Sequence, residues 1–371
     1  MQLTHKREIV LLLAFMLMII APLAGQDYRL QSNRYGTAGL SFEWWKADQD
    51  QITSFAVPVS FIYPVNPKMR FYAITSPSFN ALNTGATSHL NGLSDIKWGG
   101  HYLILDDQYL LTFGMNLPVG KTGLTLEEYS VASVLTMSAF NFRTPSLGQG
   151  LDLQAGISSA REIGDYILGY GASYLLKGGF EPLNFYDGKY IPGDELTLTL
   201  GADFGSVMAD VLYTIYFTDQ WDDASGKEDV FQSGNRLLLQ VSWTKQIQGY
   251  SMVLLVRDRI KAKNKLSTGT ELETEAKNSN ANQFEIRNDW YKPYGQGSRI
   301  KMSLNHRLYS DNDYQTGGAN LFGLGGGFDK AITSAITFNM DFKFFFGKIK
   351  TGSQAVNTTG INLLGGVQVV L

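Results

Sequence analysis

Residues 336–344 read ITFNMDFKF, and every second position in this stretch carries a large apolar side chain. The positions between them carry Thr337, Asn339, Asp341 and Lys343. Because successive side chains of an extended chain point to opposite sides, this alternation predicts a strand with one apolar and one polar face. The same pattern recurs from about residue 35 to the end of the chain, most clearly at 55–63, 109–117 and 196–204.

The length of these runs separates two kinds of all-β protein. The runs extend over 9 to 13 residues, whereas strands of soluble proteins average about 5–6 residues and tilted membrane-spanning strands need about 9–11. A closed barrel is the only arrangement in which strands pair all their backbone N–H and C=O groups inside a bilayer. We therefore predict that residues 26–371 form an all-β, transmembrane antiparallel β-barrel of 16 strands, or of 14 if residues 35–63 partly form a plug.

The links between the runs are alternately short and long. Glu162–Asp165, Gly205–Val207 and Gln246–Gly249 are short and are predicted to be periplasmic turns, whereas longer polar links are predicted to be extracellular loops. The predicted loops are residues 119–149, 178–194, 220–233, 262–282, 310–318 and 348–358.

The N-terminus has the composition of an export signal. Lys6 and Arg7 precede an apolar run from Ile9 to Ile20, and small residues follow up to Gly25. Because this run is shorter than the roughly 20 residues of a membrane-spanning helix, we predict that residues 1–25 are a signal peptide. An exported chain that forms a transmembrane barrel is expected to reside in the bacterial outer membrane. Only 18% of the residues are charged and the formal net charge is −3, so no nucleic-acid partner is expected.

Alternation also predicts which polar side chains face the barrel interior. Where Phe284, Ile286 and Trp290 face lipid, the residues between them face inward, and the same argument applies to residues 299–309. These charges line a water-filled pore or cross-link strands and a plug, and the sequence leaves both open. The predicted lumen-lining residues are Arg236, Gln240, Arg257, Glu285, Arg287, Asp289, Arg299, Lys301, Arg307, Asp341 and Lys343.

One predicted loop is unusually apolar. Within 119–149, Thr125 and Glu128 have the spacing of a capping box at the start of a helix. Apolar residues at helical spacing follow, which predicts a short amphipathic helix that forms a constriction or an apolar access site at the outer mouth. An extra strand pair, or a loop packed on its neighbours, is the alternative. The candidate constriction residues are Tyr129, Val131, Val134, Leu135 and Met137.

Three stretches contain distinctive turn motifs: 92–105, 109–123 and 147–178. They resemble the transporters encoded with phenol meta-pathway genes, a group similar to the long-chain fatty-acid transporter family of the outer membrane. Gly92, Leu93 and Asp95 match a turn that opens a strand in that group, and the run from Leu117 to Gly120 matches a strand end. The resemblance implies an outer-membrane barrel that takes up small hydrophobic or aromatic compounds.

No motif points to catalysis. The chain has no Cys, and its four His residues lack metal-ligand spacing, so we expect no catalytic residue, metal site or cofactor and no enzymatic activity. Three functions follow from the barrel prediction: passive uptake of small hydrophobic or aromatic compounds, general diffusion as a porin, and a structural or adhesive surface role without transport. The expected partners are outer-membrane lipid, a small-molecule solute and the barrel-assembly machinery during biogenesis, and the sequence leaves the oligomeric state open.

Overall fold

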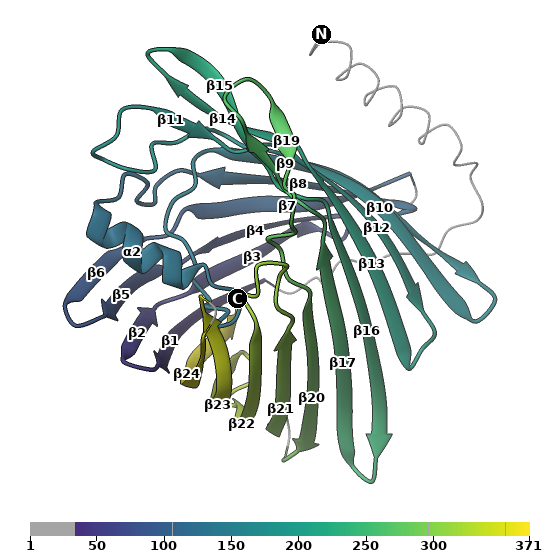
Figure 1. Ribbon diagram of the computed structural model, residues 1–371. Helices are drawn as coiled ribbons and strands as arrows, with labels where there is room; N and C mark the ends of the chain where they lie inside the picture. Colours follow the sequence, from purple (N-terminus) through teal and green to yellow (C-terminus); the bar gives the residue numbers. More distant parts are fainter. Residues whose placement is uncertain (1–33, 106, 296, 353) are drawn as a thin grey trace.

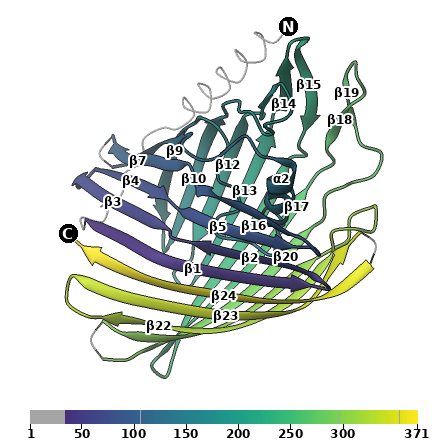
Figure 2. The same ribbon diagram turned by 90° about the vertical axis from the view of Figure 1, so that its left-hand side faces the viewer.

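The computed structural model describes residues 34–371 apart from residues 106, 296 and 353. The predicted signal peptide, residues 1–25, therefore lies outside the described residues. Within them, 16 antiparallel strands form one closed β-barrel. The first strand pairs with the last from Tyr35–Val370 to Ala47–Thr358, which closes the sheet (Figure 2). The predicted count of 16 is confirmed, and residues 35–63 belong to the wall of the barrel and not to a plug.

Three of the barrel strands are interrupted, so each is formed by two consecutive segments in register with the same neighbours. The first of these interruptions falls at Val57 and Pro58, where proline cannot donate to the ladder. In chain order the strands are β1 (Tyr35–Ala47), β2 (Asp50–Ala56) with β3 (Val59–Asn66), β4 (Met69–Thr75) with β5 (Pro77–Asn83), β6 (Thr87–Leu93) with β7 (Ile96–Ile104), β8 (Tyr109–Leu117), β9 (Asp152–Ile163), β10 (Tyr166–Leu176), β12 (Glu195–Asp203), β13 (Val207–Tyr216), β16 (Arg236–Ile247), β17 (Tyr250–Lys261), β20 (Gln283–Pro293), β21 (Arg299–Tyr309), β22 (Ala319–Ala331), β23 (Ile336–Thr351) and β24 (Gln354–Val370).

The outer surface of the barrel is an apolar belt. On β23, Met340, Phe342 and Phe346 are 41%, 42% and 43% exposed, whereas the intervening Phe345 is 1% exposed. Exposed aromatic side chains repeated around a whole sheet would be strongly unfavourable in water, since burying one Phe is worth about 1.5–3 kcal/mol. This belt is the face that a membrane-spanning barrel presents to lipid.

The two ends of the barrel differ. The start of β1, the end of β24 and only short turns lie at one end, whereas all the long connections lie at the other, together with a few short turns such as those of β1–β2 and β23–β24. The long connections at 178–194, 220–233 and 262–282 carry a second, five-stranded sheet that projects beyond the barrel (Figure 1). Its strands are β11 (Lys189–Ile191), β14 (Thr218–Asp223), β15 (Gly226–Gln232), β18 (Lys265–Ser267) and β19 (Leu272–Thr274).

The predicted loop at 348–358 is wrong. Here β23 and β24 continue as a paired hairpin up to Thr351 and Gln354. Apolar residues keep their inward positions in this segment, because Ile349 pairs with Val356, points inward and is 3% exposed. Alternation therefore persists through residues whose overall polarity resembles that of a loop.

A helix lies inside the wall of strands. The long connection between β8 and β9 folds inward and contains α2 (Leu126–Leu135), which contacts β5 and β6 (Figure 1). Its apolar residues form a core with inward side chains of the strands, among them Trp45, Leu90, Leu321 and Phe345. These strands are thus apolar on both faces where the loop covers them. Among the described residues no helical segment has the length and hydropathy of a membrane span.

Candidate pore constriction and lumen

Residues 118–151, which we call the inner loop, begin their helix as the sequence predicts. The Thr125 hydroxyl accepts from the Glu128 N–H at 3.2 Å, and the Glu128 carboxylate accepts from the Thr125 N–H at 3.1 Å, so the capping box is formed. Among the candidate constriction residues, Val131 and Leu135 are buried, Val134 and Met137 are partly buried against the same core, and Tyr129 is 52% exposed. The inner loop therefore narrows the barrel with its backbone and polar residues, because most of its apolar residues pack against the wall.

The base of the inner loop is fastened by one carboxylate. Asp95, 4% exposed, lies in the break between β6 and β7 and accepts from the Gly120 N–H, the Gln149 N–H and the Asn116 amide at 2.8, 2.8 and 3.0 Å. Its own N–H donates to the Leu147 carbonyl at 2.7 Å. A Cβ at position 120 would stand 2.1 Å from that carbonyl oxygen, so only glycine fits there. The two ends of the inner loop are thereby held together.

A buried guanidinium holds the far side of the inner loop. Arg307 on β21 is 5% exposed. Its Nη1 donates to the carbonyls of Ala139 and Phe140 at 2.8 and 3.2 Å, and its Cζ lies 4.7 Å from the centre of the Phe345 ring. A cation removed from water needs such partners, and each bond to a charged donor is worth about 1.5–3 kcal/mol.

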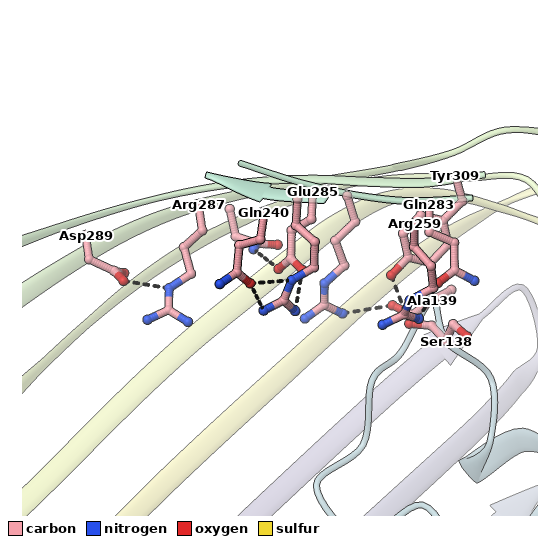
Figure 3. A network of polar contacts seen from close by, with 12 residues as sticks. Ser138, Ala139, Gln240, Arg259, Gln283, Glu285, Arg287, Asp289 and Tyr309 are labelled. Atoms are coloured by element: carbon pink, nitrogen blue, oxygen red, sulfur yellow. Dashed lines mark hydrogen bonds and ion pairs between the residues drawn. The ribbon is translucent and has the colours of Figure 1, made fainter. Parts of the chain in front are cut away.

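Two more side chains join the inner loop to the wall. The Tyr309 hydroxyl on β21 donates to the Ser138 carbonyl at 3.2 Å, and Figure 3 shows the loop reaching the strands at this point. Four strands along the wall, Glu43 of β1 is 2% exposed and accepts from the Arg143 N–H at 2.9 Å. The inner loop is thus attached to two strands, β21 and β1, of the same part of the barrel wall.

Next to the inner loop, the inner faces of β16, β17, β20 and β21 carry a network of polar side chains (Figure 3). Arg257 donates to the Gln240 side-chain oxygen from Nε at 3.0 Å and from Nη2 at 2.7 Å, and it lies 3.9 Å from the Glu285 carboxylate. Asn305 donates to the other Glu285 oxygen at 2.7 Å. The network keeps these long side chains extended across neighbouring strands.

The charges continue along the wall. Arg287 pairs with Asp289 on the same strand at 2.6 Å. Lys301 bridges Asp329 at 2.8 Å and Asp341 at 3.2 Å, and Asp329 also pairs with Arg299. Between these strands, β22 presents three glycines inward, where added Cβ atoms would strike side chains of β23. Because these glycines have no side chains, the side chains of Asp341, Lys343 and Phe345 can extend over the inner face of β22.

Two cavities inside the barrel stand out by volume among the described residues. One, of about 310 Å³, lies between the inner loop and the charged wall; its charged lining is Glu43, Arg143, Glu285, Arg287, Arg307, Asp341 and Lys343. The other, of about 480 Å³, lies along β8, β9, β10 and β12 and is lined mainly by small side chains; they include Thr112, Ser158, Gly169, Gly171, Ser173 and Thr199. The lumen therefore has one charged wall and one smooth wall without charged groups over most of its area.

Strand register places the predicted lumen residues on inward positions, but not in one environment. Arg307 lies beneath the inner loop, and Arg236, at the start of β16, lies nearest the outer mouth. The inward positions are occupied by Arg236, Gln240, Arg257, Glu285, Arg287, Asp289, Arg299, Lys301, Arg307, Asp341 and Lys343. Sequence reasoning missed Glu43 and Arg143 as site residues. The alternation of Leu40, Phe42 and Trp44 with Ser41 and Glu43 was the signal that could have identified Glu43.

Within the described part of the chain, no group of three or more His, Asp or Glu side chains is placed to hold a metal ion. The polar residues are instead engaged with each other and with the inner loop. A solute bound in the lumen would therefore be held by the charged and polar side chains and by the shape of the lumen, without a metal ion.

The chain matches no protein-family model and no curated protein. Its fold is similar to that of a TodX deletion mutant, a monoaromatic hydrocarbon channel, with a TM-score of 0.50 and 8% identity over 92% of this chain and 91% of that chain. The CymD monoaromatic hydrocarbon channel has a TM-score of 0.45 and 10% identity over 92% and 89% of the two chains. For an anion-selective porin from Comamonas acidovorans the values are 0.40 and 10% over 91% and 98%. The barrel fold that the resemblance implied is confirmed.

Proposed function

We propose that this protein is a passive outer-membrane channel for small hydrophobic or aromatic compounds. The observation that supports this most directly is the inner loop, which narrows a closed barrel and leaves a cavity of about 480 Å³ along a wall of small side chains. Sites for small molecules are mostly apolar hollows of about 300–1,000 Å³. The shared fold with a monoaromatic hydrocarbon channel agrees with this assignment.

General diffusion is the second candidate, and the charged wall favours it. Water-filled pores are lined by polar side chains, and here acidic and basic groups face the same lumen. In either case transport is passive and the protein's partners are outer-membrane lipid and a small solute. Export by the signal peptide at residues 1–25 and folding by the barrel-assembly machinery complete the proposal.

A deletion of residues 125–140 tests both functions. The wild type and the deletion variant are expressed in cells whose outer membrane lacks other channels, and uptake of labelled toluene is compared with uptake of labelled arabinose. For a hydrocarbon channel, the wild type takes up toluene preferentially and the deletion removes this preference. For a general porin, arabinose enters through the wild type and the deletion raises its uptake together with single-channel conductance.

The control is a deletion of residues 268–271 in the exposed turn between β18 and β19, which is far from the inner loop in the projecting sheet. Folding of all variants is checked by the migration of unheated samples in SDS gels. Unchanged uptake of both solutes on removal of the whole gene contradicts transport and favours a structural or adhesive barrel.

A further inference from the structure

Three cations gather at the outer end of the lumen. Arg236 begins β16 and Lys261 ends β17, and the register places these two residues directly opposite each other. Arg259 lies two residues before Lys261 and therefore on the same inner face. Like charges placed directly opposite each other destabilise a sheet unless something compensates them. We call Arg236, Arg259 and Lys261 the outer cation cluster.

Within the described residues, none of the three cations forms an ion pair with Asp or Glu. Nearby carboxylates are engaged elsewhere. Asp219 accepts from the Tyr190 hydroxyl and the Gly193 N–H, and Glu275 accepts from backbone N–H groups of the projecting sheet and its loops. The three cations therefore lack a direct ion pair, unlike the paired charges deeper in the barrel, although the carboxylates of Asp219 and Glu275 act on Lys261 from a distance.

The groups in direct contact with the cluster are neutral and include an aromatic ring. Arg236 Cζ and Lys261 Nζ each lie 5.8 Å from the centre of the Tyr216 ring. Arg259 donates from Nη1 to the Gln283 side-chain oxygen at 2.6 Å (Figure 3), and its Nε has no hydrogen-bond partner within the described residues. One guanidinium and one ammonium thus lie against the Tyr216 ring, and the second guanidinium, of Arg259, keeps an unused Nε–H donor.

We propose that the outer cation cluster is an oxyanion site that binds the carboxylate of small aromatic or apolar acids as they enter the lumen. The inference rests on the proposed channel function and names its solute class. Guanidinium groups match a carboxylate with two parallel hydrogen bonds, and an ammonium adds a point charge. The Tyr216 ring offers a surface for the body of the acid, and the smooth wall beyond it, lined mainly by small side chains, accepts that body. A neutral hydrocarbon would gain nothing from the three charges.

The experiment measures ion selectivity in planar bilayers. The full chain is reconstituted, and reversal potentials at pH 7 give the permeability of benzoate, phosphate and chloride relative to sodium. The variant R236Q/R259Q/K261Q is compared with K227Q/K245Q/K330Q, which removes the same number of charges from side chains outside the lumen. Charges at the mouth of a cleft raise local anion encounter by 10-fold or more, so we expect the ratio of benzoate to sodium permeability to fall about tenfold in the cluster variant and to stay unchanged in the control.

Several results would overturn the proposal. Equal losses for chloride and benzoate would indicate a diffuse field without a carboxylate site, and a loss for phosphate alone would assign the site to phosphate. An unchanged benzoate ratio in a folded cluster variant would also refute it. If the triple variant fails to fold, Arg259→Gln alone is used, and a loss of at least twofold is expected. If the wild type shows no conductance at all, the proposed channel function is refuted. This result is thereby distinguished from a failure of the oxyanion site alone.

Discussion

Replacing Asp95 by Asn tests whether one carboxylate holds the inner loop closed. The carboxylate accepts three hydrogen bonds, two of them from backbone N–H groups at the two ends of the loop. The amide of Asn has one acceptor oxygen, so it keeps at most the bonds from Gln149 and Asn116 and turns an NH₂ group toward the Gly120 N–H. The base of the inner loop is therefore expected to open.

The magnitude follows from the bonds lost. One hydrogen bond to a charged acceptor is worth about 1.5–3 kcal/mol, and the two that remain change from charged to neutral, at a cost of about 0.5–1.5 kcal/mol each. The loop is then destabilised by about 3 kcal/mol or more, and since 1.4 kcal/mol is a factor of ten, the open population rises roughly a hundredfold.

Trypsin can measure this population, because Lys121 and Arg143 lie within the inner loop. Cleavage of a transiently open segment follows its equilibrium population when closing is fast. We expect loop cleavage in detergent-solubilised Asp95→Asn to be about a hundred times faster than in the wild type, while the barrel stays folded in unheated gels. Asp165→Asn, in an exposed turn at the opposite end, should cleave like the wild type. Equal rates for the wild type and Asp95→Asn, with both barrels folded, would refute the assigned role.

Three further predictions concern the inner loop and the wall. Arg307→Met leaves two buried loop carbonyls without their donor, at a cost of about 2–5 kcal/mol, so it should increase tryptic cleavage of the inner loop without unfolding the barrel. Gly325→Val places a Cβ 2.7 Å from a side-chain carbon and a backbone oxygen of β23 and should lower the unfolding temperature of the barrel in a heated-gel series; Gly326→Val, whose Cβ meets nothing closer than 3.5 Å, should not. Burial alone would raise the pKa of Glu128, but hydrogen bonds from Lys121 and the helix start hold that pKa below its ordinary value of 4.5. The contribution of the Glu128 carboxylate to the capping box is therefore present above about pH 4.5 and lost as the pH falls below that value. Current noise from the inner loop should rise with acidification in the wild type. In Glu128→Gln this noise should depend less on pH.

The barrel was predictable because its strands obey one local rule. Side-chain alternation identifies a strand and its lipid face at once, and no long-range contact is needed to see that Phe342 and Lys343 point in opposite directions. The capping box at Thr125 is equally local. Where both faces of a strand are apolar, polar and apolar residues no longer alternate, so the sequence does not show which side chains face inward. Trp45 and Leu90 face inward because a distant loop covers them, and their own neighbours in the sequence do not show this.

The attachments of the inner loop could not be predicted for the same reason. Glu43 meets the Arg143 N–H across 100 positions of the chain, and Arg307 meets the carbonyl of Ala139 across 168. A charged residue at an inward position looks the same in sequence whether it faces water or lies under a loop. The outer cation cluster needed the register of β16 against β17, since only direct pairing shows that two cations oppose each other.

The three stretches that carry the sequence resemblance meet at one place in the fold. Asp95, Gly120 and Leu147 come from separate stretches, and their backbone and carboxylate groups join at the base of the inner loop. What looked in sequence like turn chemistry at strand ends thus sets the angle at which the inner loop enters the barrel. The base is fixed by Asp95 and the far side by Arg307, which share no hydrogen-bond partner among the described residues. Since each attachment restrains a different part of the loop, the width of the lumen depends on both, and loss of either opens the constriction on one side only.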